Sequence, residues 1–96
     1  MKIDFTKNTE NLEVKIEGRL DTTTAPELDS FLNANLAGVK ALAIDCEQLT
    51  YVSSAGLRVL LSAHKKMKGA VKLKNVCELV MEVFEITGFV DVLTIE

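Results

Sequence analysis

Polar and hydrophobic residues alternate through the first twenty positions of the chain. One alternating stretch contains Ile3 and Phe5, and a second contains Leu12, Val14 and Ile16. A period of two with β-branched residues is typical of strands that bury one face. The polar residues 7–11 between the two stretches predict a turn. We therefore expect two antiparallel strands joined as a hairpin.

The next stretch has the spacing of an α-helix. Its hydrophobic residues fall on one stripe, at Leu28, Phe31, Leu32 and Leu36. Thr24 and Glu27 match the capping box, in which both side chains bind free N–H groups at the start of a helix. Pro26 is tolerated in a first turn, and Gly38 is a plausible stop.

A continuous apolar run, Ala41–Ile44, is typical of a strand that is covered on both faces. We expect this strand to end at Asp45 and residues 46–52 to form a loop. A second helix is predicted from Ala55 to Lys68, and Gly69 interrupts it.

The last quarter of the chain predicts three more elements. Residues 70–76 alternate as a strand. A helical stripe follows, at Leu79, Val80, Val83, Phe84 and Ile86, and Gly88 ends it. Residues 90–95 predict a final short strand.

This order, β-β-α-β-α-β-α-β, predicts a single small α/β domain that spans residues 1–96. Alternating strands and helices favour a mixed, mostly parallel sheet with an N-terminal hairpin and with helices packed on it. Functional loops in such sheets follow the carboxyl ends of strands. Asp21 and the pair Ser53-Ser54 follow the second and third strands, so we expect these two loops to be neighbours if the strands are.

Composition and charge narrow the classes of function. The chain has 96 residues and a net charge of −3, with 14 acidic and 11 basic residues interspersed. The lack of a basic block argues against nucleic acid as a partner. The N-terminus lacks the apolar core of a signal peptide, and no apolar run is long enough to cross a membrane. We expect a soluble, cytoplasmic domain without direct membrane insertion, a monomer or weak dimer when alone.

Candidate chemistry argues against an enzyme. The only histidine, His64, lies about 15 Å along the helix from Ser54 if Ser54 caps it, whereas a general base must come within roughly 3 Å of its nucleophile. Cys46 and Cys77 are 31 positions apart and do not form a metal-binding motif; we expect buried, free thiols. No glycine-rich nucleotide loop is present. We therefore expect neither catalysis nor a cofactor nor a metal.

Two adjacent hydroxyls, Ser53 and Ser54, stand at the predicted start of the second helix. Serine is a preferred N-cap because its oxygen accepts a hydrogen bond from a free N–H of the first turn. The same end of a helix favours an anion, so a phosphate is tolerated there. The residues alone leave both roles open.

Several motifs together resemble the STAS domain, specifically the stand-alone anti-sigma-factor antagonists of bacterial partner-switching systems. The family's first loop and helix start are similar to Gly18-Arg19-Leu20-Asp21 and Thr24-Ala25-Pro26-Glu27-Leu28. Its third strand and phosphorylation loop are similar to Ala43-Ile44-Asp45 and Leu49-Thr50-Tyr51-Val52-Ser53-Ser54-Ala55-Gly56-Leu57. Its last strand and helix are similar to Leu73-Lys74-Asn75-Val76 and Val83-Phe84-Glu85-Ile86-Thr87-Gly88.

The resemblance implies a switch that is acted on by other proteins. In that family the unphosphorylated protein binds an anti-sigma factor serine kinase, phosphorylation releases it, and a serine phosphatase resets it. Ser54 takes the acceptor position, with Ser53 as the second candidate because it stands where many members have Asp. The expected partner-binding residues are Asp21, Thr22, Thr23, Ser53, Ala55, Gly56 and Arg58.

Two alternatives come with the same resemblance. Some small STAS domains bind the ATPase subunit of a lipid-transport ABC transporter, in which case the helix-start hydroxyl contributes to a constitutive interface. Other partner-switching modules have an output that is not transcription.

Overall fold

Five strands form one sheet, in the order β1-β2-β3-β4-β5, in the computed structural model, which describes residues 1–96. The elements in chain order are β1 (Lys2–Asn8), β2 (Asn11–Leu20), α1 (Ala25–Asn35), β3 (Ala41–Val52), α2 (Ser54–Lys66), β4 (Val71–Lys74), α3 (Glu78–Thr87), the 3-10 helix η1 (Phe89–Asp91) and β5 (Thr94–Ile95). β1 pairs antiparallel with β2, and all other neighbours are parallel. The predicted fold class and the N-terminal hairpin are therefore confirmed.

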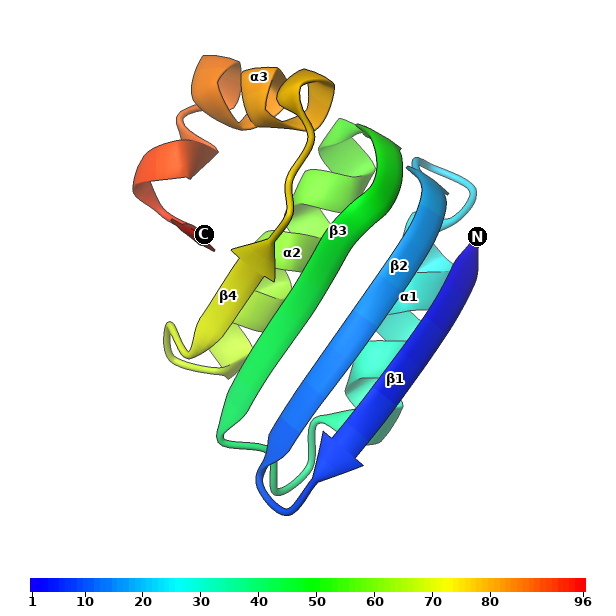
Figure 1. Cartoon of the computed structure of the whole chain (residues 1–96), viewed down its shortest axis with the longest axis vertical. Helices are drawn as coiled ribbons and strands as arrows, with labels where there is room; N and C mark the ends of the chain where they lie inside the picture. Colours follow the sequence, from blue (N-terminus) through cyan, green and yellow to red (C-terminus); the bar gives the residue numbers. More distant parts are fainter.

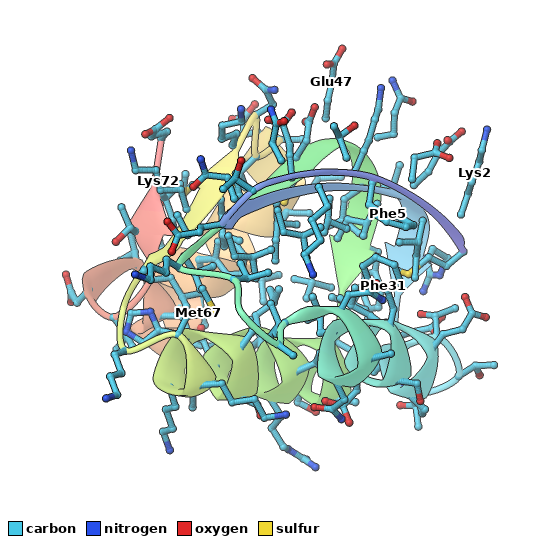
Figure 2. All side chains as sticks on the ribbon, turned by 90° about the horizontal axis from the view of Figure 1, so that it is seen from below. Lys2, Phe5, Phe31, Glu47, Met67 and Lys72 are labelled. Atoms are coloured by element: carbon cyan, nitrogen blue, oxygen red, sulfur yellow. The ribbon has the colours of Figure 1, made fainter.

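Helices α1 and α2 pack on one face of the sheet (Figure 1). The alternating apolar residues of β2 point toward these helices and join a core of 20 buried residues. Figure 2 shows Phe5 of β1 and Phe31 of α1 between the two layers, where their ring centroids lie 5.0 Å apart. Glu47 and Lys72 point away from the opposite face, which no helix covers. The alternation along the strands thus gives the sheet one face that is buried under helices and one face that carries charged side chains.

Strand β3 extends well beyond the end that the sequence predicts. Residues 46–52, expected as a loop, continue the strand to Val52. Their buried positions, Cys46, Leu49 and Val52, are spaced by three instead of two because the register with β2 shifts twice. Each shift places one extra residue in β3, which is the effect of a β-bulge. As a result, β2 and β3 stay paired until Leu20 and Val52, where both strands end.

The C-terminal elements are shorter than predicted. β4 covers four residues of the expected strand 70–76, and α2 ends at Lys66 instead of Lys68. Gly88, with φ of 79°, ends α3 in the left-handed conformation, and the chain then turns through η1. Because η1 uses the start of the expected strand 90–95, only two residues of it pair as β5. None of the helices combines the length and the apolar character needed to cross a membrane.

The two cysteines differ in exposure, and their reactivity is expected to differ accordingly. Cys46 is fully buried, and burial raises the pKa of its thiol to about 12. Cys77 is only half-buried, so the expectation of two buried thiols is wrong for this residue. A thiolate-directed reagent at pH 8 should label one cysteine, Cys77, in the native protein and both in denaturant, as peptide mass spectrometry would report. Equal labelling of both in the native protein would contradict this assignment.

Candidate functional site

The start of α2 gives its two serines different roles. Ser53 is the N-cap residue, in extended conformation, and its Oγ accepts a hydrogen bond from the Gly56 N–H at 3.3 Å. Ser54 is the first residue of the helix and is exposed, and its hydroxyl makes no hydrogen bond within the chain. The cap is thus Ser53 and not Ser54. Of the two hydroxyls, only that of Ser54 is both exposed and free of hydrogen bonds within the chain.

Removal of the cap should lower stability measurably. Ser53→Ala leaves the Gly56 N–H without its side-chain acceptor, and the expected loss is about 1 kcal/mol of the free energy of unfolding. Ser54→Ala is the matched control, since it removes a hydroxyl with no partner and should change stability little. Urea unfolding of both variants checks this, and an equal loss in the two would contradict the assignment of the cap.

The loop after β2 is organised by the carboxylate of Asp21. Its Oδ1 accepts hydrogen bonds from the N–H groups of Thr23 at 3.0 Å and Thr24 at 3.1 Å. These bonds, that of the Thr24 N–H first, hold the pKa of Asp21 below its usual value. The carboxylate is therefore ionised at neutral pH, and it fixes the chain at the start of α1.

The predicted capping box at Thr24 is wrong in its side-chain contacts. Thr24 does precede α1, but its hydroxyl makes no cap hydrogen bond to the helix. Its Oγ1 instead donates to the Arg19 carbonyl oxygen at 2.6 Å and accepts from the Asp21 N–H at 2.8 Å. The hydroxyl therefore closes the β2–α1 loop, and Asp21 supplies the acceptor for the free N–H groups.

The two candidate loops lie together, as expected from parallel strands. Leu20 and Val52 are register partners, and the Ser53 N–H donates to the Leu20 carbonyl oxygen at 2.9 Å. One residue beyond this bond stand Asp21 on one side and Ser54 on the other. Thr22 and Thr23 are exposed in the same loop. The carboxyl ends of β2 and β3 thus form one small, polar surface.

The first turns of α2 contribute unequally to this surface. Arg58 is exposed and Ala55 is half-buried. Gly56 is buried, and a Cβ built on it would lie 2.7 Å from Leu20 Cγ and 2.8 Å from the Leu20 carbonyl oxygen. Gly56 therefore allows α2 to approach β2 closely, and its burial leaves little of its surface for the partner contact that the sequence predicts.

Arg19 and Tyr51 also belong to this surface, although the sequence analysis did not select them as site residues. They are register partners on β2 and β3, and the Arg19 guanidinium carbon lies 4.1 Å from the centre of the Tyr51 ring. Arg19 Nε is also 3.5 Å from Asp21 Oδ2. A cation held over an aromatic face and beside a carboxylate is fixed in direction. Only the register of β2 against β3 could have predicted that Arg19 and Tyr51 are neighbours. That register depends on the two bulges of β3, which the sequence pattern does not reveal.

The imidazole that the sequence offers as a candidate base does not lie beside Ser54. His64 lies in the last turn of α2, at the other end of the helix. The main hollow of the molecule, about 810 Å³, lies on the open face of the sheet, and Ala43 of β3 is one of its lining residues. The charged side chains of this hollow are paired within the chain, Lys72 with Glu96 at 3.3 Å and Lys74 with Glu13 at 3.6 Å. The Ser54 hydroxyl is thus accessible to another molecule and has no imidazole beside it.

Comparison with known proteins places the chain in a family. The model of the STAS domain matches residues 2–96. The anti-sigma-B factor antagonist of Bacillus subtilis (strain 168) is 31% identical, over 99% of this chain and 90% of the relative.

Solved structures agree in fold. The anti-sigma factor antagonist SpoIIAA in its unphosphorylated form superposes with a TM-score of 0.83 at 16% identity, over 99% of this chain and 88% of the other. The phosphorylated form of SpoIIAA, a Bacillus cell fate determinant, gives a TM-score of 0.74 at 15% identity, over 99% and 91% of the two chains. The match over nearly the whole length, together with the fold and the sequence motifs, shows that this chain belongs to the STAS domain family.

Proposed function

We propose that this protein is an anti-sigma-factor antagonist of a partner-switching system. In its unphosphorylated form it binds an anti-sigma factor serine kinase, and phosphorylation of Ser54 by that kinase releases it. A serine phosphatase then restores the hydroxyl. The protein itself is a regulatory binding module and not an enzyme. The name of the Bacillus subtilis relative, an anti-sigma-B factor antagonist, supports this role.

The observation that carries the proposal is that only one of the two serine hydroxyls caps the helix. Ser53 uses its Oγ for the helix cap, whereas Ser54 is exposed and unbonded. A kinase needs a hydroxyl that can enter its active site without breaking the fold. This difference favours Ser54 over Ser53 as the acceptor, although the sequence leaves both open.

The local charges suit a switch that acts on the partner. A phosphoserine adds about −1.5 to −2 charges at neutral pH. At the first residue of α2 this charge meets the free N–H groups and the positive end of the helix dipole, so the fold tolerates it. The ionised Asp21 in the adjacent loop adds negative charge on the same surface. A partner that fits the neutral surface must then accommodate at least two negative charges.

The partner-binding surface in this proposal comprises the residues exposed or half-buried around Ser54. They are Asp21, Thr22, Thr23, Ser53, Ala55 and Arg58, with Arg19 and Tyr51 added from the structure. Arginine and tyrosine are enriched among the residues that dominate binding energy in protein interfaces. Arg19 and Tyr51 are thus the strongest anchors available beside the serine.

Affinity capture from the native cell tests the function class directly. The tagged protein should recover a serine kinase of the anti-sigma type, identified by mass spectrometry, and Ser54→Asp should recover much less of it. Recovery of the ATPase subunit of a lipid transporter instead, equally by both forms, would overturn the proposal in favour of a constitutive accessory role. The Ser54→Asp protein must retain the circular dichroism spectrum of the wild type.

A further inference from the structure

Helix α3 carries a hydrophobic stripe that faces solvent. Leu79 is 68% exposed and Ile86 is 85% exposed. These two residues are seven positions apart, which is two helical turns, and the half-buried Val83 lies between them on the same side. We refer to Leu79, Val83 and Ile86 as the α3 stripe. All three belong to the helical stripe that the sequence predicts, which does not say which of its residues are covered.

The core uses a different side of the same helix. Val80 and Phe84, one turn apart, are buried. α3 is therefore apolar on two sides, and only one of them is covered by the rest of the chain. Val83 also packs against the core, whereas Leu79 and Ile86 do not. Exposed apolar side chains on a helix that is already anchored by its inner side add little to the fold, and such surfaces mark interaction sites.

The charge around the α3 stripe defines what can cover it. Residues 75–96 contain five acidic and no basic residues, whereas residues 1–74 contain nine acidic and eleven basic residues. Three of the carboxylates lie on α3 itself, beside the stripe: Glu78, Glu82 and Glu85. The stripe is thus apolar with a purely acidic border.

This border argues against two occupants. A second copy of the chain paired through α3 about a two-fold axis would place these carboxylates against one another. An anionic lipid surface would be repelled by them. The complementary partner is a protein with an apolar groove edged by lysine or arginine, which receives α3 as an amphipathic helix.

The position of α3 connects it with the surface around Ser54. α3 follows the carboxyl end of β4, and α2 follows the carboxyl end of the parallel neighbour β3, so both helices start at the same end of the sheet. Cys77, directly before α3, places its Sγ 3.5 Å from the Leu49 carbonyl oxygen of β3. Figure 1 shows α3 at this upper end of the sheet. Ser54 and α3 therefore lie at the same end of the sheet, where one partner can contact both.

We propose that the α3 stripe docks in a basic-edged apolar groove of the same kinase that recognises Ser54. This inference rests on the proposed function. A stable interface of standard size covers about 800 Å² on each partner, and the surface around Ser54 consists mainly of small polar residues. The stripe adds aliphatic contact to the aromatic contact that Tyr51 supplies on this surface. Because it does not include the serine, its contribution is the same before and after phosphorylation.

Paired variants with the purified cognate kinase test the α3 stripe. Leu79→Ser combined with Ile86→Ser should weaken binding, measured by titration calorimetry, by about tenfold or more, because both side chains lose apolar burial in the complex. Leu79→Met combined with Ile86→Leu keeps the stripe apolar and should bind within about threefold of the wild type. Both residues are exposed in the free protein, so thermal melts should be close to those of the wild type.

The acidic border has its own test. Glu78→Lys combined with Glu82→Lys should slow association and reduce the dependence of the association rate on salt. The control, Asp4→Lys combined with Glu17→Lys on β1 and β2, makes the same change in net charge away from α3 and should have a smaller effect. Wild-type affinity in the serine double variant, or equal rates in both lysine variants, would overturn the docking of α3 while the proposed function stands. Failure of the wild type to bind the kinase would overturn both.

Discussion

Phosphorylation of Ser54 is expected to lower the affinity for the kinase by at least about 100-fold, which corresponds to about 3 kcal/mol. The exposed hydroxyl becomes a dianion on a surface that already carries the ionised Asp21. A partner that fits the neutral serine must bury this charge without a matching cation, which is costly in an interface. The free protein avoids this cost because solvent and the start of α2 stabilise the phosphate.

Calorimetry with the purified phosphorylated protein measures this effect. The control is Ser54→Ala, which cannot carry a phosphate and should bind the kinase like the unphosphorylated wild type. The melting curve of the phosphorylated protein should stay close to that of the unphosphorylated one. An unchanged affinity after stoichiometric phosphorylation of Ser54 would contradict the switch, and an unfolded phosphoprotein would contradict the account of its electrostatics.

Substitution of Gly56 by valine is expected to destabilise the fold by about 3 kcal/mol, a large part of the stability of a domain of this size. The first new carbon would lie 2.8 Å from the Leu20 carbonyl oxygen, which is backbone and also accepts the hydrogen bond of the Ser53 N–H. Relief of this contact requires α2 to move away from β2. The gain of about 0.5 kcal/mol from replacing glycine in a helix does not offset it.

The matched control places the same residue on the outer side of the same helix. Arg58→Val is exposed and should cost about 0.5 kcal/mol through helix propensity alone. Guanidinium unfolding of the two variants gives the comparison. If both unfolded at the same denaturant concentration, the close approach of α2 and β2 at Gly56 would not be a constraint on the fold.

The sequence predicted most elements of the fold because each one has a clear hydrophobic period. The end of β3 is the main exception. Two bulges change the spacing of its buried residues from two to three, so that Cys46, Leu49 and Val52 do not alternate. A bulge depends on the partner strand, and the pattern of a single strand does not contain it.

The sequence predicted α3 and its end at Gly88, but it did not show which of the apolar residues of α3 are buried. Periodicity identifies an apolar side of a helix but not what covers that side. Leu79 and Ile86 have the same spacing as core residues, yet they face solvent, while Val80 and Phe84 fill the core. The sequence of this helix alone therefore does not distinguish apolar residues that fill the core from apolar residues that face solvent. The packing of the helix in the structure is needed to separate them.

The sequence predicted where the candidate site lies, but it did not predict the hydrogen bonds and side-chain contacts within the site. The element order placed Asp21 beside Ser53 and Ser54. The division between a capping and a free serine depends on the backbone of the helix start, and the capping box at Thr24 fitted the sequence but not the hydrogen bonds. The contact of Arg19 with Tyr51 required the true register of β2 and β3.

The most direct test of the central claim is the location of the phosphate. The wild type, Ser53→Ala and Ser54→Ala are incubated with the cognate kinase and ATP, and intact and peptide masses are recorded over time. We predict one phosphate on the wild type and on Ser53→Ala, carried by Ser54 in both, and none on Ser54→Ala. Full phosphorylation of Ser54→Ala, or a phosphate on Ser53 of the wild type, would contradict the account.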